Sequence, residues 1–323
     1  MVIHIYIAAC SEDGGIYHYT KNSDGSLTEI DFYPLDRPMY LAVKNGKMHV
    51  LLRSPFKNNE ESGYISYTIR SDGSLTEPSE IISTMGEVAC HLFVPSDENT
   101  VYCANYVTGS VFKSPSALVS HEGEGPSKPR QDKPHTHYVN ETPDGKYIFV
   151  TDLGLDTIFT YSKDLKEISR AKVPEGHGVR HLAYSADGNT VFAANELAST
   201  VSAFEYDNGV LTIKDTVCCL PDDFHGETTL AAIRVKDGMI YASNRGHDSI
   251  SCLEYTDGKL SLLSVIKTGG ASPRDFDFVG DCIYSTNEMS NSVTVLKKSG
   301  KSLSLLPFSY SAQNPLSIVS IEI

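Results

Sequence analysis

Short apolar runs separated by glycine-containing turns fill most of this chain. One clear stretch has strand-like runs at residues 136–141, 146–151 and 157–161. A Pro-Asp-Gly turn at 143–145 and an Asp-Leu-Gly turn at 152–154 separate the three runs. Glycine takes the positive φ angle that a tight hairpin turn requires, so this stretch predicts neighbouring antiparallel strands.

The same unit recurs along the whole chain. Each copy has four short strands, with Asp-Gly turns after the first and third strands and a loop after the second. A period of roughly 40 to 50 residues built from short strands is typical of a β-propeller, and helical periodicity is nearly absent. Seven copies predict an all-β, seven-bladed propeller of four-stranded antiparallel blades. The second strands are centred, 43 to 53 residues apart, at Tyr6, His49, Tyr102, Phe149, Phe192, Tyr241 and Tyr284.

The two chain ends predict how the ring closes. The chain begins with a second strand, near residues 2–8, and ends with an unpartnered first strand at 315–321. Pairing of these two strands would complete the N-terminal blade and remove an exposed sheet edge. We therefore expect residues 1–323 to form one propeller domain, closed by the C-terminal strand.

Charge and composition narrow the possible partners. The formal net charge is −14, with 27 Lys and Arg against 41 Asp and Glu, which argues against nucleic acid or an anionic membrane surface. No apolar run approaches the length of a membrane helix, and residues 1–7 resemble a strand without a signal-peptide leader. The seven cysteines are scattered in apolar runs. We expect a cytoplasmic protein with free thiols.

The blade pattern also predicts which residues share one face. First-strand starts and the loops after second strands lie on one side of the disc, whereas the Asp-Gly turns lie on the other. His137 and Arg180 stand at equivalent positions, each seven residues before the Asp of its turn. The residues that we expect to converge at one mouth of the central channel are His135, His137, Arg180, His181, Asn195, Glu196, Arg245, Arg274 and Glu288.

Arginine, histidine and glutamate in one place suggest a site for an anionic substrate. Arginine presents a planar fork that suits carboxylate or phosphate, and histidine or a buried glutamate can take a proton. A structural reading is also open, in which pairs such as Glu196 and Arg245 only tie neighbouring blades together. His135 and His137 have a metal-like spacing but no third ligand nearby in sequence, so we predict neither a metal nor another cofactor. No covalent nucleophile is evident.

Several motifs resemble one known family. H-T-H-Y-V-N-E-T-P-D-G at 135–145, V-R-H-L at 179–182, N-R-G-H at 244–247 and S-P-R-D-F at 272–276 look like the seven-bladed propeller lactonases. That family holds the propeller-type 6-phosphogluconolactonases and a fungal enzyme that cyclises carboxy-cis,cis-muconate. The resemblance covers essentially the whole chain and is strongest over residues 133–280.

The resemblance implies a site and a substrate class. The family's proposed active site, one His, two Arg and one Glu, falls on His137, Arg180, Glu196 and Arg245. His135, His181, Asn195, Arg274 and Glu288 remain expected substrate-binding residues. The implied function is hydrolysis of a small anionic sugar lactone, and the substrate that we expect is 6-phospho-D-glucono-1,5-lactone, with His137 or Glu196 as the base.

Two other functions stay open at this point. One is a muconate-type cycloisomerase that uses the same residues, and the other is a binding propeller without activity. The loops at 122–133 and 221–229 enter from the functional face, and we expect both to form walls of the pocket. The sequence carries no prediction of the oligomeric state.

Overall fold

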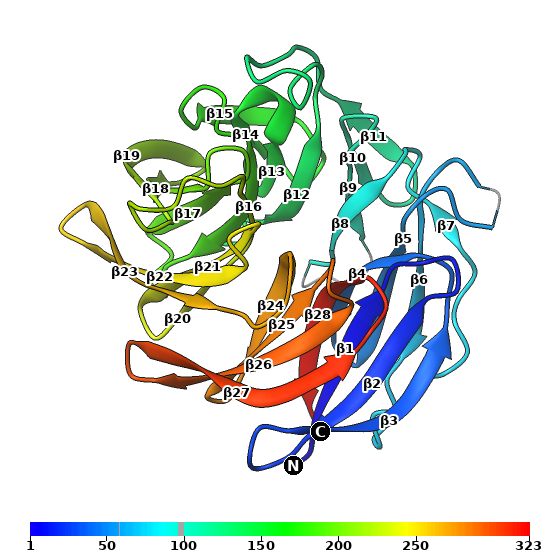
Figure 1. Ribbon diagram of the computed structural model, residues 1–323. Coiled ribbons are helices and arrows are strands. Elements are labelled where there is room, and N and C mark those ends of the chain that lie inside the picture. Colours follow the sequence, from blue (N-terminus) through cyan, green and yellow to red (C-terminus); the bar gives the residue numbers. More distant parts are fainter. Residues whose placement is uncertain (58, 96–99) are drawn as a thin grey trace.

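Seven four-stranded antiparallel sheets form a closed ring around a central channel (Figure 1). The computed structural model describes residues 1–57, 59–95 and 100–323. In ring order, the innermost strands are β28 (Pro315–Glu322), β4 (Pro38–Lys44), β8 (Ala89–Phe93), β12 (Thr136–Glu141), β16 (Val179–Tyr184), β20 (Thr229–Lys236) and β24 (Pro273–Val279). The second strands are β1 (Ile3–Ala9), β5 (Lys47–Leu52), β9 (Tyr102–Asn105), β13 (Ile148–Asp152), β17 (Thr190–Asn195), β21 (Met239–Arg245) and β25 (Cys282–Asn287).

The outer half of each blade has two more strands. The third strands are β2 (Gly15–Lys21), β6 (Gly63–Thr68), β10 (Ser110–Lys113), β14 (Thr157–Tyr161), β18 (Thr200–Asp207), β22 (Ser249–Thr256) and β26 (Ser292–Ser299). The outermost strands are β3 (Leu27–Pro34), β7 (Ile82–Ser83), β11 (Ala117–Ser120), β15 (Glu167–Lys172), β19 (Val210–Cys218), β23 (Lys259–Lys267) and β27 (Ser302–Ser311). The short 3₁₀ helix η1 (Leu153–Leu155) precedes β14. Within the described residues, no helix has the length and apolar character needed to cross a bilayer.

The predicted fold and its closure are confirmed. β1 pairs antiparallel with β28, with Tyr6 opposite Val319, so the N-terminal blade contains both ends of the chain. Some strand boundaries differ from the predictions by one or two residues; β13, for example, covers Ile148–Asp152 rather than residues 146–151. The Lys146 amide is used in the turn, where it donates to Asp144 Oδ1 at 3.2 Å.

Packing between blades explains the recurring aromatic position at the centre of the second strands. Every member of that series is buried, from 0% exposed at Phe149 to 6% exposed at His49. Complete burial of a phenylalanine side chain, as at Phe149, stabilises the fold by about 1.5–3 kcal/mol. The Tyr284 hydroxyl also donates to Gly25 O at 2.8 Å, and Tyr102 donates to Lys163 O at 2.7 Å. These bonds reach the turns between third and fourth strands of the following blade.

A register shift between the first and second strands recurs in all seven blades. In six of them a single residue of the inner strand has no residue opposite it. For example, Val179 faces Asn195 and His181 faces Ala194, which leaves Arg180 unpaired. Such a β-bulge redirects the side chain of the extra residue. The unpaired residues are Met39, Cys90, His137, Arg180, Arg274 and Leu316, with the pair Ala231-Ala232 of β20 in the remaining blade.

Candidate active site

The bulges direct a ring of side chains into one mouth of the channel. A cavity of about 250 Å³ lies there, between the starts of inner strands and the ends of second strands. Four bulge residues reach it directly, and loop residues complete its wall. Among the described residues, the lining consists of Met39, Arg53, Val88, Cys90, Tyr106, Arg130, His137, Glu196, Arg245 and Arg274.

Glu196 is the centre of an ion cluster at this mouth. Its Oε2 lies 3.0 Å from Arg180 Nε and 3.1 Å from Arg245 Nη2, and its Oε1 lies 2.6 Å from Arg130 Nη2. Glu196 and Arg180 are almost completely buried, whereas the Arg130 side chain is 44% exposed. Arg180 also donates to Ala231 O at 2.8 Å. One carboxylate therefore holds three guanidinium groups from three different segments.

The electrostatics of the cluster keep Glu196 ionised. Burial alone would raise the pKa of the Glu196 carboxyl, but the charges of Arg245 and Arg180 hold that pKa well below its usual value. Burial lowers the pKa of Arg180 to about 9, helped by the like charge of Arg274 and opposed by Glu196. Both carboxylate oxygens of Glu196 are also paired with guanidinium groups, Oε1 with Arg130 and Oε2 with Arg180 and Arg245. Glu196 is thus better suited to holding the arginines than to taking a proton.

His137 faces the cavity from its bulge in β12. Burial, reinforced by the charge of Arg180, lowers the pKa of the His137 imidazole well below its ordinary value, so the ring is neutral at pH 7. The ring lies edge-on to Tyr106, with centroids 5.6 Å apart. Burial raises the pKa of the neighbouring Cys90 thiol to about 12, which leaves it protonated. The neutral imidazole is therefore a better proton acceptor than the thiol.

The lining carries an excess of positive charge. Four arginines and one carboxylate line the described part of the cavity. Arg274 has a long ion pair of 3.4 Å with Glu288, and no ion pair joins the Arg53 side chain to another described residue. On a protein with a net charge of −14, this local excess favours an anionic ligand.

The other predicted residues lie around the cavity rather than in its lining. The His135 ring stacks on Tyr106 with centroids 4.4 Å apart. The His181 ring lies deeper in the channel, with its centroid 5.2 Å from that of His137. Glu288 reaches the cavity only through Arg274. The substrate-binding role of these three residues stays a prediction.

Asn195 has a structural environment. It is completely buried at the end of β17, and its Nδ2 donates to Ser202 Oγ at 2.8 Å and to Thr200 Oγ1 at 3.0 Å. Asn244 at the end of β21 makes the same two bonds to its own third strand, with Ser251 and Ser249. This repeated contact accounts for asparagine at that position, and a substrate-binding role for Asn195 likewise stays a prediction.

Loops contribute lining residues that the strand pattern did not identify. Arg130 belongs to the 122–133 loop, which therefore forms part of the wall as expected. Arg53 and Tyr106 follow β5 and β9, in loops whose sequences do not repeat from blade to blade. The sequence did contain one signal for Arg53. It is a charged residue at the end of a second strand, and Arg245 has the corresponding place in β21. None of the described residues of the 221–229 loop is among the lining residues.

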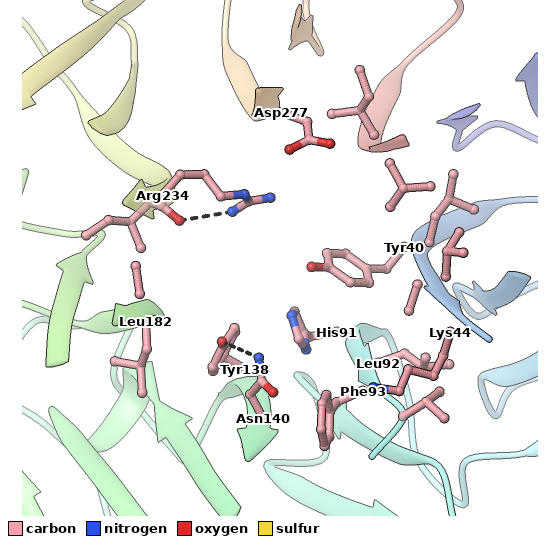
Figure 2. A pocket seen from close by; sticks show the side chains of 18 of the residues that line it. Tyr40, Lys44, His91, Leu92, Phe93, Tyr138, Asn140, Leu182, Arg234 and Asp277 are labelled. Carbon is pink, nitrogen blue, oxygen red and sulfur yellow. Dashed lines mark hydrogen bonds between the residues drawn. The ribbon is translucent and has the colours of Figure 1, made fainter. Parts of the chain in front are cut away.

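The opposite mouth of the channel has a different character (Figure 2). A cavity of about 590 Å³ lies there, lined by later residues of all seven inner strands. Figure 2 shows Tyr40, His91, Tyr138, Arg234 and Asp277 around this space. Arg234 Nη2 lies 2.7 Å from Asp275 Oδ1, so its charge is already balanced. No predicted catalytic residue lines this second cavity in the described part of the chain.

Within the part of the chain that the structure describes, no group of three or more His, Cys, Asp or Glu side chains is arranged to hold a metal ion.

Comparison with known proteins agrees with the architecture. The family model for "Lactonase, 7-bladed beta-propeller" matches residues 4–319. An uncharacterized protein of Staphylococcus aureus strain N315 is 32% identical over 310 residues, which cover 88% of this chain and 89% of the relative.

Two solved structures are similar over nearly their whole length. The periplasmic gluconolactonase of Pseudomonas aeruginosa has a TM-score of 0.90 and 22% identity, covering 100% of this chain and 99% of that one. A Bacteroides fragilis protein, provisionally assigned as a 6-phosphogluconolactonase, has a TM-score of 0.89 and 23% identity, covering 99% and 98%. At these identities the likeness establishes the shared fold.

Proposed function

The chain belongs to the seven-bladed β-propeller lactonase family, and from this premise we propose that it hydrolyses an anionic sugar lactone, 6-phospho-D-glucono-1,5-lactone. One observation carries the choice of an anionic substrate. The cavity beside His137 has four arginines against one carboxylate in its described lining. Arginine binds phosphate and carboxylate through paired, charge-assisted hydrogen bonds.

The proposed roles follow from what each side chain already contacts. Of the four lining arginines, Arg53 has no ion pair with another described residue and Arg274 has a long one of 3.4 Å with Glu288. These two guanidinium groups bind the phosphate in this proposal. Arg245 lines the cavity and donates to the oxygen that becomes negative in the tetrahedral intermediate. A fixed donor of this kind contributes about 3–4 kcal/mol to transition-state stabilisation. Glu196 holds Arg245 and Arg130 in place, and the buried Arg180 pairs with the same carboxylate.

His137 acts as the general base in this proposal. The neutral ring accepts a proton from a water molecule, and the resulting hydroxide oxygen bonds to the lactone carbonyl carbon. The ring C–O bond then breaks, and the protonated imidazole returns the proton to the departing alkoxide. General base catalysis of this type is typically worth roughly 10²- to 10⁴-fold. The product is an open-chain sugar acid.

The cellular location is part of the same proposal. All seven cysteines are free thiols, which supports a reducing compartment. We therefore propose that the protein works in the cytoplasm.

A substrate panel tests the proposal. Purified protein is given freshly prepared 6-phosphogluconolactone, unphosphorylated gluconolactone and a carboxymuconate, and hydrolysis is followed by acid release or, for the muconate, by ultraviolet absorbance. We expect the highest kcat/KM with the phosphorylated lactone. Equal rates on both lactones would remove phosphate recognition from the proposal, and turnover of the muconate alone would replace hydrolysis with cycloisomerisation. Arg170→Ala, at an exposed position on β15, serves as the matched control for any arginine variant.

A further inference from the structure

The backbone just before each charged bulge residue is held by an aspartate. The amide concerned lies two residues before His137, Arg180 and Arg274. A hydrogen bond to an ionised carboxylate is short and roughly twice as strong as a neutral one, so it fixes the chain more firmly. The bonds are His135 N to Asp152 Oδ1 at 2.8 Å, Gly178 N to Asp156 Oδ1 at 2.6 Å and Ser272 N to Asp248 Oδ1 at 2.7 Å.

The carboxylate of Asp156 contacts more than one segment near the cavity. This buried carboxylate also accepts from Gln131 Nε2 at 2.7 Å, and Gln131 is completely buried. Gln131 is the neighbour of Arg130 in the sequence. The carbonyl of Gly178 in turn accepts from Glu196 N at 2.7 Å. One aspartate therefore contacts the segments that carry Arg130 and Arg180, and through Gly178 it is linked to Glu196; these are three of the four members of the ion cluster.

Bulges with apolar residues have neutral partners instead. Leu316 is the bulge residue of β28, and the amide two residues before it, Asn314 N, donates to Asn291 Oδ1 at 2.7 Å. Before Cys90 the corresponding amide, Val88 N, donates to Ser54 Oγ at 2.8 Å. The acceptor comes from different places, since Asp156, Asp248 and Asn291 precede third strands of the preceding blade, whereas Asp152 ends β13 of the same blade. In these contacts a carboxylate is found where the bulge residue carries a guanidinium or an imidazole.

We propose that Asp152, Asp156 and Asp248 are positioning residues for the cavity, which hold His137, Arg180 and Arg274 respectively in their reactive geometry. None of the three aspartates is among the residues lining the cavity, so they act through the backbone. Such support is effective because a misplacement of about 1 Å at a reacting group can cost about 10²-fold in rate. This inference rests on the proposed function for its kinetic consequences.

The chain offers closely matched variants for a test. Asp156, Asp248 and Asn291 all have left-handed backbone conformations, with φ of 53°, 53° and 50°. The backbone carbonyl of each of these residues accepts a hydrogen bond from the amide that follows the outermost strand of the same blade. In the third blade Gly109 O accepts in the same way from His121 N. Gly109 has φ of 59°, so glycine is already accommodated at this place in the fold. Substitution by glycine removes the side-chain contact and leaves the backbone unstrained.

The experiment compares Asp156→Gly and Asp248→Gly with Asn291→Gly as the structural control. We expect the largest loss of thermal stability in Asp156→Gly, because its carboxylate accepts from Gly178 N, Gly176 N and Gln131 Nε2. Smaller losses are expected in Asp248→Gly and Asn291→Gly, whose side chains accept fewer hydrogen bonds. We expect kcat for the phosphorylated lactone to fall about 10- to 100-fold in Asp156→Gly, which loosens the ion cluster. In Asp248→Gly the KM should rise by a similar factor, because Arg274 binds the substrate's anionic group. Asn291→Gly should keep the wild-type constants.

Binding of inorganic phosphate, measured by calorimetry, provides a readout without turnover. We expect weaker phosphate binding in Asp248→Gly and wild-type affinity in Asn291→Gly. If the wild type hydrolyses none of the lactones, the proposed function fails, and the phosphate titrations alone decide the positioning role. The inference is overturned if the aspartate variants match Asn291→Gly in both kinetics and phosphate affinity, or if the wild type neither turns over lactone nor binds phosphate.

Discussion

The guanidinium of Arg130 lies 2.6 Å from the carboxylate of Glu196, although 66 residues separate them in the sequence. The loop that carries Arg130 enters β12, and Glu196 follows β17 in the next blade. The contact therefore closes one side of the cavity across a boundary between blades. Arg180 and Arg245 share the same carboxylate, at 3.0 and 3.1 Å, so the wall depends on a single acidic residue.

Replacement of that acidic residue should affect both stability and activity. In Glu196→Gln the buried Arg180 loses its counter-charge, and removal of one partner from a buried ion pair typically costs about 3–5 kcal/mol. We expect the free energy of unfolding in urea to fall by that amount and kcat/KM to fall at least tenfold.

A surface pair provides the control for this substitution. Glu205 pairs with Lys214 at 2.5 Å, and their side chains are 60% and 38% exposed. An exposed pair contributes at most about 1 kcal/mol, so Glu205→Gln should change little. Equal losses in the two variants would contradict a central role for Glu196.

Arg53 lines the cavity but was not among the predicted residues, and its substitution tests the anionic site. We expect Arg53→Ala to raise KM for the phosphorylated lactone about 10- to 100-fold, because a hydrogen bond to a charged group is worth about 1.5–3 kcal/mol. The kcat should change less, since this residue binds the part of the substrate that does not react. Steady-state kinetics measure both constants, and an unchanged KM would exclude Arg53 from phosphate binding.

The neutral histidines of the channel predict how stability depends on pH. Burial, with added repulsion from the nearby arginines, lowers the pKa values of His91, His137 and His181 well below 6.5 in the folded protein. The unfolded chain therefore binds more protons below pH 6.5. Above pH 6.5 the titration of these rings does not change the free energy of unfolding. Below pH 6.5 each ring lowers that free energy by up to about 1.4 kcal/mol per pH unit.

Thermal melts between pH 7.5 and 5.0 check this dependence. We expect the wild-type Tm to fall steadily below pH 6.5. His181→Phe should show a smaller slope, because one titrating ring is gone, whereas a substitution of the exposed His225 should keep the wild-type slope. A wild-type Tm that rises on acidification to pH 5.5 would contradict the neutral state of these rings.

Ring closure gives a separate prediction about the fold. A chain ending at residue 312 lacks β28, which leaves the edge of β1 without a partner and an inner strand missing from the channel. We expect loss of cooperative unfolding and association through the exposed edge. Circular dichroism melts and size-exclusion chromatography measure the two effects. A truncated chain that stays monomeric and melts like the full chain would show that closure does not stabilise the ring.

The fold was accessible from the sequence because its determinants repeat. Seven aromatic or imidazole residues, from Tyr6 to Tyr284, mark one buried position in every blade, and turn glycines punctuate the strands. Repetition of this kind is visible in a single sequence. The ring closure also followed from strand counting at the two ends.

The site was accessible only in part, for two physical reasons. A β-bulge inserts one residue without changing the local composition, so the pattern did not distinguish inward-facing His137 from His135, which stacks on Tyr106. Arg53 and Arg130 lie in loops that do not repeat, and their direction depends on tertiary contacts. Of the expected residues, His137, Glu196, Arg245 and Arg274 line the cavity, and Arg180 supports it through Glu196.

A crystal structure with bound 6-phosphogluconate tests where the active site lies. We predict that the sugar acid occupies the arginine-lined mouth, with its phosphate on Arg53 and Arg274 and its carboxylate within hydrogen-bond distance of Arg245 and His137. Binding in the opposite cavity shown in Figure 2, beside Tyr40 and Arg234, would contradict the assignment of the active site.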